Sequence, residues 1–231
     1  YVRVMAGQWK ILLAYAFLPL AVKLMIDFYE SPSLLNCLKV ACVILIIGII
    51  NVPMMTLTLG VLFLFFIFKI LSVRRDRVRA IRLILGLTVI LGAVLFCSVY
   101  WIGPVITSGS NLLTQINPKD TITFSAKTWG SDLGALFNVA TMHGFWRAGY
   151  TYIWDVFSGW YLLFFTILFL AVVGSVQFWR HDKVGTYVKS LSCMWFIAVI
   201  LGIGASSSQL SLFYEFLFEE FIVFRGFRDS H

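Results

Sequence analysis

Residues Leu83–Ile102 read LILGLTVILGAVLFCSVYWI and contain no Asp, Glu, Lys, Arg or His. A helix rises about 1.5 Å per residue, so about 20 apolar residues cross a hydrocarbon core roughly 30 Å thick. Lipid offers no hydrogen-bond partners to an open backbone, so a crossing segment must be a helix. Two further uncharged runs are at least as long, Val156–Phe178 and Leu191–Leu210. The chain is therefore predicted to be an integral membrane protein.

The composition agrees with this prediction. Hydrophobic residues make up 60% of the chain and charged residues 13%, against roughly 45–50% and 25% in soluble domains. The net charge of +7 does not predict nucleic-acid binding, because the positive residues cluster at the ends of apolar segments. The four cysteines lie in or beside apolar segments and form no CxxC motif. This placement favours buried thiols over disulfides or a metal site.

The fold class predicted is an all-α integral membrane bundle of about six transmembrane helices with one external loop. The predicted spans are Ile11–Ile26, Leu34–Ile50, Val52–Leu71, Leu83–Ile102, Val156–Phe178 and a last one that starts near Val188. The second and third spans could instead form one kinked helix. That helix of about 38 residues would be about 57 Å long, too long for one bilayer. We therefore expect two helices that turn at Asn51–Pro53.

Three regions follow from these spans. Residues 1–102 hold the first four transmembrane helices, residues 103–155 form an external loop, and residues 156–231 hold the last two helices and an aromatic, acidic tail. In the tail, Glu215 and Glu219 lie four residues apart. This spacing fits either an internal ion-pair network or the solvated edge of an interfacial helix. The sequence begins without Met, and we expect it to be a fragment of a longer protein.

The orientation is predicted from the basic loops. Residues 69–82 carry six positive charges and one negative charge, and residues 179–189 carry three and one, whereas the charges of residues 103–155 cancel. The positive-inside rule places the loops at 69–82 and 179–189 in the cytoplasm and the loop at 103–155 outside the plasma membrane. The polar stretch at 27–33 would then be cytoplasmic too. The arginines at 74–82 are predicted to be a topology signal, with binding of anionic lipid head groups as the alternative.

The external loop holds the first candidate site. From Asp132 to Arg147 apolar residues recur at helical spacing, which predicts an amphipathic helix on the membrane surface. His143, Trp146 and Arg147 share one face of it if the helix continues. Arg pairs with phosphate oxygens and Trp stacks on sugar rings, so this face could bind a sugar phosphate. Interfacial anchoring by the tryptophan and the arginine is the alternative.

No catalytic residue or metal site can be assigned from spacing. The loop aspartates Asp120, Asp132 and Asp155 could act as a base or bind a divalent ion, but no two of them are close in the sequence. No nucleotide-binding or hydrolase motif occurs in a sequence context that fits it. We therefore expect no cofactor within this chain.

Two stretches resemble a known family. The segment Gly7–Leu20, GQWKILLAYAFLPL, resembles the Tyr-Ala-Leu-Leu-Pro helix start found midway along GT-C-type membrane glycosyltransferases of the arabinofuranosyltransferase-like and YfhO-like branches. The segment Phe224–His231, FRGFRDSH, is similar to their F-R-x-P-x-K-F element, with Ser230 where Pro is common. Thr123–Ser125 and Gly144–Trp146 fit that pattern loosely.

The resemblance implies sugar transfer from a polyprenyl-phosphate donor on the external face, with a divalent cation in the full-length protein. It places Arg225, Arg228 and Asp229 at a cavity edge and puts the catalytic acid outside this chain. Membrane lipids and the lipid-linked sugar are the partners expected, and nucleic acid is not. The alternative is a non-catalytic polytopic membrane protein, such as a transporter, a lipid flippase or an assembly subunit.

Overall fold

A computed structural model describes residues 9–107, 137, 139–140, 157–181, 184–203, 212–213, 216 and 220. These residues include six helices and no strand: α2 (Trp9–Glu30), α3 (Leu34–Ile50), α4 (Val52–Ser72), α5 (Arg77–Thr107), α10 (Trp160–Phe178) and α11 (Gly185–Ile203). The chain divides into two compact units, Tyr1–Ser108 and Gly109–His231. The prediction of an all-helical protein is confirmed for the described residues.

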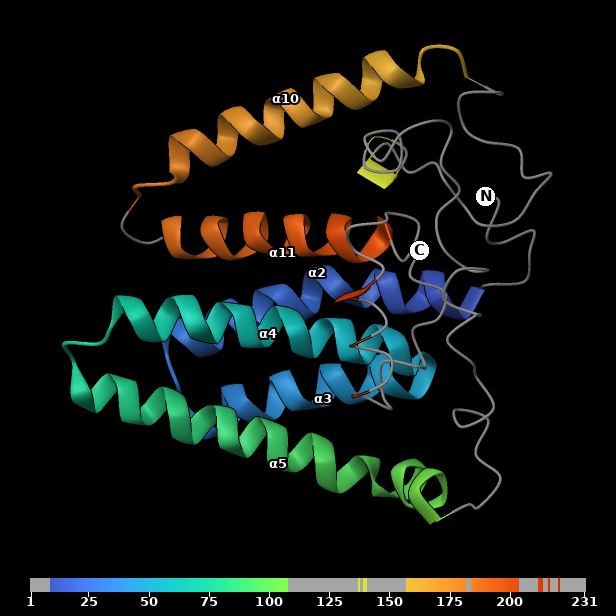
Figure 1. The fold of residues 1–231 in the computed structure, drawn as a ribbon. Coiled ribbons are helices and arrows are strands. Elements are labelled where there is room, and N and C mark those ends of the chain that lie inside the picture. Colours follow the sequence, from blue (N-terminus) through green and yellow to red (C-terminus); the bar gives the residue numbers. More distant parts are fainter. Residues whose placement is uncertain are drawn as a thin grey trace. The chain divides into compact units, whose positions relative to one another are not determined.

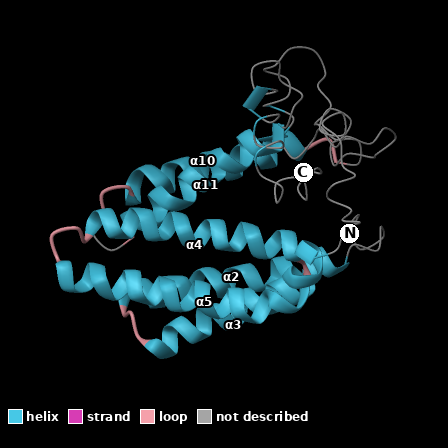
Figure 2. Ribbon diagram, turned by 60° about the horizontal axis from the view of Figure 1, so that its bottom comes forward, coloured by secondary structure: helices cyan, strands magenta, loops and turns pink. Residues whose placement is uncertain are grey.

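The described residues of the first unit form a bundle of the four helices α2, α3, α4 and α5, which alternate in direction (Figures 1 and 2). Helix α3 lies at its centre and packs against α2, α4 and α5, while α2 also packs against α4. The core is aliphatic and aromatic, and its largest fully buried side chains include Tyr29, Phe28 and Phe65. Short turns join consecutive helices, so every pair of neighbours in the sequence is antiparallel.

Helices α3 and α4 are separate, as predicted, and Asn51 is the single residue between them. Its backbone is extended, with φ −157° and ψ 108°. Its N–H donates to Ile47 O at 2.7 Å, which closes α3. Its side-chain oxygen accepts from the N–H of Met54 at 3.0 Å, which caps α4. Pro53 lies in the first turn of α4. Its missing N–H costs no helical hydrogen bond there, because N–H groups in the first turn have no partner within the helix.

Helix α5 is longer than its apolar run. It begins six residues before Leu83 and ends at Thr107, so the helix extends beyond the predicted span Leu83–Ile102 at both ends. Gly103 and Pro104 do not end the helix, because a proline near a helix end removes only one late hydrogen bond. The residues buried along α5 recur every three or four positions: Leu83, Gly86, Leu87, Ile90, Val94 and Ser98. This stripe faces the rest of the unit.

The outward faces of the helices are apolar as well. On α5 the exposed residues include Leu85, Leu95 and Phe96, the last 81% exposed. Water would favour polar side chains on such faces, whereas lipid favours apolar ones. Helices α2, α4, α5 and α10 are long and apolar enough to cross a membrane, while α3 and α11 are shorter apolar helices. The described part of the chain is thus a membrane-embedded helical protein.

The second unit contains α10 and α11, which pack against each other. Residues 179–184 join them. The backbone of Gly185 lies close to that of Trp179, so that a Cβ at position 185 would lie 2.6 Å from the carbonyl oxygen of Trp179. The predicted span over Val156–Phe178 is a helix from Trp160 onward. The predicted amphipathic helix over 132–147 lies mostly outside the described residues, although Phe137, Val139 and Ala140 are helical.

Candidate functional site

The side chains predicted to bind substrate all lie outside the described residues. These are His143, Trp146 and Arg147 of the predicted external loop, and Arg225, Arg228 and Asp229 of the tail. The same holds for the three loop aspartates at 120, 132 and 155. Their roles remain predictions, and the polar site described below is a different one.

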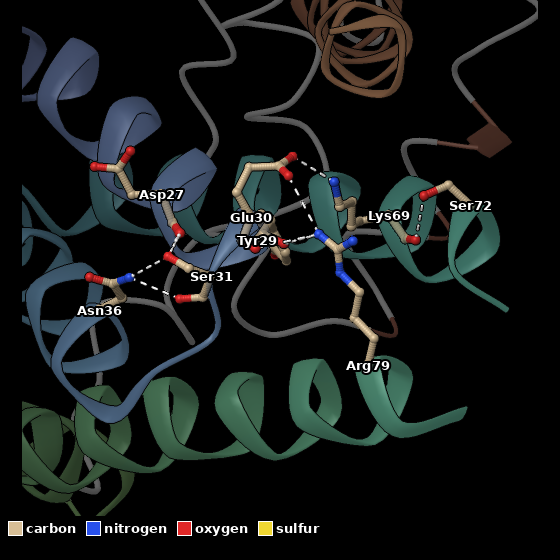
Figure 3. Close-up of polar contacts among 8 residues, drawn as sticks. All are labelled: Asp27, Tyr29, Glu30, Ser31, Asn36, Lys69, Ser72 and Arg79. Atoms are coloured by element: carbon tan, nitrogen blue, oxygen red, sulfur yellow. Dashed lines mark hydrogen bonds and ion pairs between the residues drawn. The ribbon is translucent and has the colours of Figure 1, made fainter. Parts of the chain in front are cut away.

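Charged side chains from three helices meet at one end of the first unit (Figure 3). Lys69 Nζ donates to Glu30 Oε1 at 2.6 Å. One terminal guanidinium nitrogen of Arg79 lies 3.4 Å from Glu30 Oε2 and 3.4 Å from the carbonyl oxygens of Tyr29 and Glu30. One carboxylate thus faces two cations and ties α2 to α4 and α5. We call Glu30, Lys69 and Arg79 the charged cluster.

Helix geometry explains why these three residues meet. Glu30 is the last residue of α2, Lys69 lies in the last turn of α4, and Arg79 lies in the first turn of α5. Antiparallel packing brings these three helix ends together. Arg79 precedes the buried residue Leu83 by four positions, so it lies on the inward face of α5. The side chain of Lys69 is only 8% exposed, whereas that of Glu30 is 45% exposed.

Tyr29, the residue before Glu30, lies in the core of the unit. Its ring is fully buried, and its Oη donates to the carbonyl oxygen of Leu62 in α4 at 2.6 Å. The ring of Phe28 lies 4.8 Å from that of Tyr29, and the ring of Phe65 lies 6.3 Å from it at a steep angle. Buried tyrosines keep their hydroxyl bonded in this way because an unmade hydrogen bond in the interior is costly.

Capping interactions fix the two turns at the same end. In the first turn Ser33 accepts from the N–H of Asn36 at 3.3 Å, and the Asn36 side chain donates to Ser31 O at 2.9 Å. In the second turn Asp76 accepts from the N–H of Arg79 at 3.0 Å, which caps α5. Side-chain acceptors at helix starts satisfy N–H groups that lack helical partners. Hydrogen bonds from side chains therefore fix the two turns next to the charged cluster.

This arrangement ties the ends of three helices together. Each charge of the cluster faces one of opposite sign, so the cations are held in place and not presented to a substrate. Lys69 is the one buried side chain among the described residues that carries a charge at neutral pH. In the same part of the chain, no group of three or more His, Cys, Asp or Glu side chains could hold a metal ion.

The sequence interpretation missed the charged cluster. It assigned Lys69 and Arg79 to a basic loop over 69–82 and Glu30 to a polar loop over 27–33. In the structure, α2 continues to Glu30, α4 to Ser72, and α5 starts at Arg77, so only short turns remain. One signal was present: a lysine within an apolar span usually has a polar partner in the protein. The position of that partner depended on how the helices pack.

No family model, curated protein or solved structure matches this chain.

Proposed function

We propose that this chain is a membrane-embedded segment of a GT-C-like glycosyltransferase that uses a polyprenyl-phosphate sugar on the external face. In this proposal the first unit is a scaffold, and the lipid-linked donor is held by the arginines of the tail. The proposal draws its chemistry from the resemblance of Gly7–Leu20 and Phe224–His231 to that family. The full-length protein would supply the catalytic acid and the divalent cation.

The observation that supports a scaffold role is the apolar interior of the first unit. Among its described residues, 9–107, the buried side chains that carry a hydroxyl, a thiol or a charge are Tyr29, Cys37, Thr58, Lys69 and Ser98. The Thr58 hydroxyl donates to Met54 O at 2.7 Å in its own helix, and the Tyr29 hydroxyl donates to Leu62 O. Ion and proton pathways need polar groups along the bundle interior. Among residues 9–107, the buried charged group, Lys69, lies at one end of the bundle and not along a path through it.

The same observation favours a second candidate, a non-catalytic assembly subunit, over a transporter or a lipid flippase. A subunit needs a packed bundle with apolar outward faces, and both features are present in the described residues of the first unit. The two candidates differ in what the tail does. In the transferase Arg225 and Arg228 contact the donor phosphate, whereas in a subunit they contact no substrate.

A transfer assay separates the candidates. Membranes that contain the protein from its complete reading frame are supplied with polyprenyl-phosphate sugars, and the transferred sugar is measured. The transferase proposal expects transfer by the unmodified protein and a loss of at least tenfold in Arg225→Ala and Arg228→Ala, since each would remove a charge-assisted contact to phosphate. Arg180→Ala is the matched control, because Arg180 is exposed in the α10–α11 connection.

Unchanged transfer in both tail variants would remove these arginines from the site. Absence of transfer with every donor, in protein that is correctly inserted, would contradict the transferase and leave the subunit candidate.

A further inference from the structure

Four arginines near the α4–α5 turn take no part in the charged cluster. Arg74 and Arg75 lie in the turn, and Arg77 and Arg82 lie in the first part of α5. All four are exposed, and no ion pair between described residues engages any of them. The one acid among them is Asp76, whose carboxylate caps α5. The turn and the start of α5 therefore present four exposed guanidinium groups beside a single carboxylate.

Helix geometry places these arginines beside apolar surface. The apolar run of α5 begins at Leu83, so residues 77–82 extend the helix by about 9 Å beyond it. Val78, Ile81 and Leu85 are exposed on the same helix, each by more than half. Arginine side chains at such a boundary lay their carbon chains on apolar surface and keep the guanidinium group at head-group level.

We propose that Arg74, Arg75, Arg77 and Arg82 form a binding surface for the phosphate head groups of anionic phospholipids. Guanidinium groups bind phosphate oxygens through paired hydrogen bonds, which ammonium groups do not reproduce. The exposed apolar residues beside them fit acyl chains, which favours a lipid over a soluble anion. Arg79 is excluded from this surface because Glu30 engages it. The inference does not depend on the proposed sugar transfer or on which leaflet the turn occupies.

The experiment measures which lipids the protein retains. The chain is reconstituted in vesicles of phosphatidylcholine with a minor share of phosphatidylglycerol, extracted in mild detergent, and its bound lipids are quantified by mass spectrometry. We expect severalfold enrichment of phosphatidylglycerol over the vesicle composition, and a lower enrichment at high salt. Each basic residue near an anionic surface contributes up to about fivefold in affinity. The variant R74Q/R75Q/R77Q/R82Q is therefore expected to lose the enrichment.

Two matched variants separate lipid binding from bundle stability. Arg79→Gln is expected to lower the melting temperature and to keep the phosphatidylglycerol enrichment. Replacing the same four arginines by lysine keeps the charge, so the enrichment is expected to fall only in part. If the fourfold glutamine variant does not insert, R74Q/R75Q carries the test, because both positions lie outside the helices. An unmodified protein without phosphatidylglycerol enrichment, or a folded glutamine variant with the same enrichment as the unmodified protein, would overturn the proposal.

Discussion

The ammonium group of Lys69 lies 2.6 Å from a carboxylate oxygen of Glu30, although 39 residues separate the two in the sequence. The partners differ in exposure, since the Lys69 side chain is 8% exposed and that of Glu30 is 45% exposed. Removing Glu30 and removing Lys69 should therefore lower the stability of the unit by different amounts. A charge left in the interior without its counter-ion costs more than one that water can reach.

We predict that Glu30→Gln destabilises the first unit more than Lys69→Met does. The glutamine takes the carboxylate away from Lys69 and Arg79 together and should cost about 1–3 kcal/mol. The methionine fills the space of the lysine chain and leaves Glu30 beside Arg79 and water, so its cost should stay below about 1 kcal/mol. Thermal unfolding of the purified protein in detergent measures both. Equal losses would show that the ion pair does not control this end of the unit.

Tyr29→Phe tests the hydrogen bond between α2 and α4. The substitution keeps the buried ring and removes the hydroxyl that donates to Leu62 O at 2.6 Å. We expect a loss of about 0.5–1.5 kcal/mol in unfolding free energy. Tyr15→Phe on the same helix is the control, because Tyr15 is 48% exposed. A melting temperature that falls by the same amount in both variants would argue against the Leu62 bond.

Gly86→Ala tests the close approach of α2 to α5. A Cβ at Gly86 would lie 2.5 Å and 2.8 Å from two ring carbons of Phe28, and 3.2 Å from Cys37 Sγ. Phe28 is fully buried, so its ring has little room to move, and overpacking of this kind costs about 1–3 kcal/mol. Gly92→Ala is the control, since nothing lies within 4 Å of the added carbon there. We expect Gly86→Ala to lower the melting temperature and Gly92→Ala to keep or raise it.

Much of the fold could be predicted because hydropathy reports which residues cross lipid. The apolar runs locate the six helices of the described residues, and bilayer thickness separates α3 from α4 at Asn51. Helix ends were less predictable. Asp27 and Glu30 are polar, yet α2 continues through both, because Lys23 pairs with Asp27 at 2.8 Å and Tyr29 is buried. Hydropathy marks the lipid-facing length of a helix and does not mark its caps.

The charged cluster depends on contacts between residues far apart in the sequence. Local charge counting assigns Lys69 and Arg79 to a topology signal, and it treats all six cations of residues 69–82 alike. The packed helices divide them: Lys69 and Arg79 face Glu30, whereas Arg74, Arg75, Arg77 and Arg82 remain exposed. That division follows from which face of each helix is buried, and no periodicity in the turn itself reveals it.

Asn51→Ala tests the one-residue connection between α3 and α4. The alanine cannot accept the N–H of Met54, so α4 loses its cap and the unit should lose about 1 kcal/mol. Asn51→Asp keeps an acceptor in the same place and is expected to retain most of the stability. Thermal unfolding in detergent distinguishes the two variants. Equal stability of the alanine variant and the unmodified protein would mean that packing alone holds this turn.

Labelling of single cysteines tests the arrangement of the two turns that flank the charged cluster. The free cysteines Cys37, Cys42, Cys97 and Cys193 are first replaced by alanine. One new cysteine is then placed at Ser31 in one variant and at Arg75 in another. The charged cluster joins these turns at one end of the unit, so both cysteines should react from the same side of the membrane.

The arginines further predict that this side is the cytoplasm. A membrane-impermeant maleimide should therefore label neither cysteine in intact cells and should label both after permeabilisation. A cysteine in place of Val52, at the opposite turn of the bundle, is the reference for the external side and should react in intact cells where the reagent reaches it. Labelling of the two basic-end positions from opposite sides would contradict the four-helix arrangement, whereas labelling of both in intact cells would reverse the predicted orientation alone.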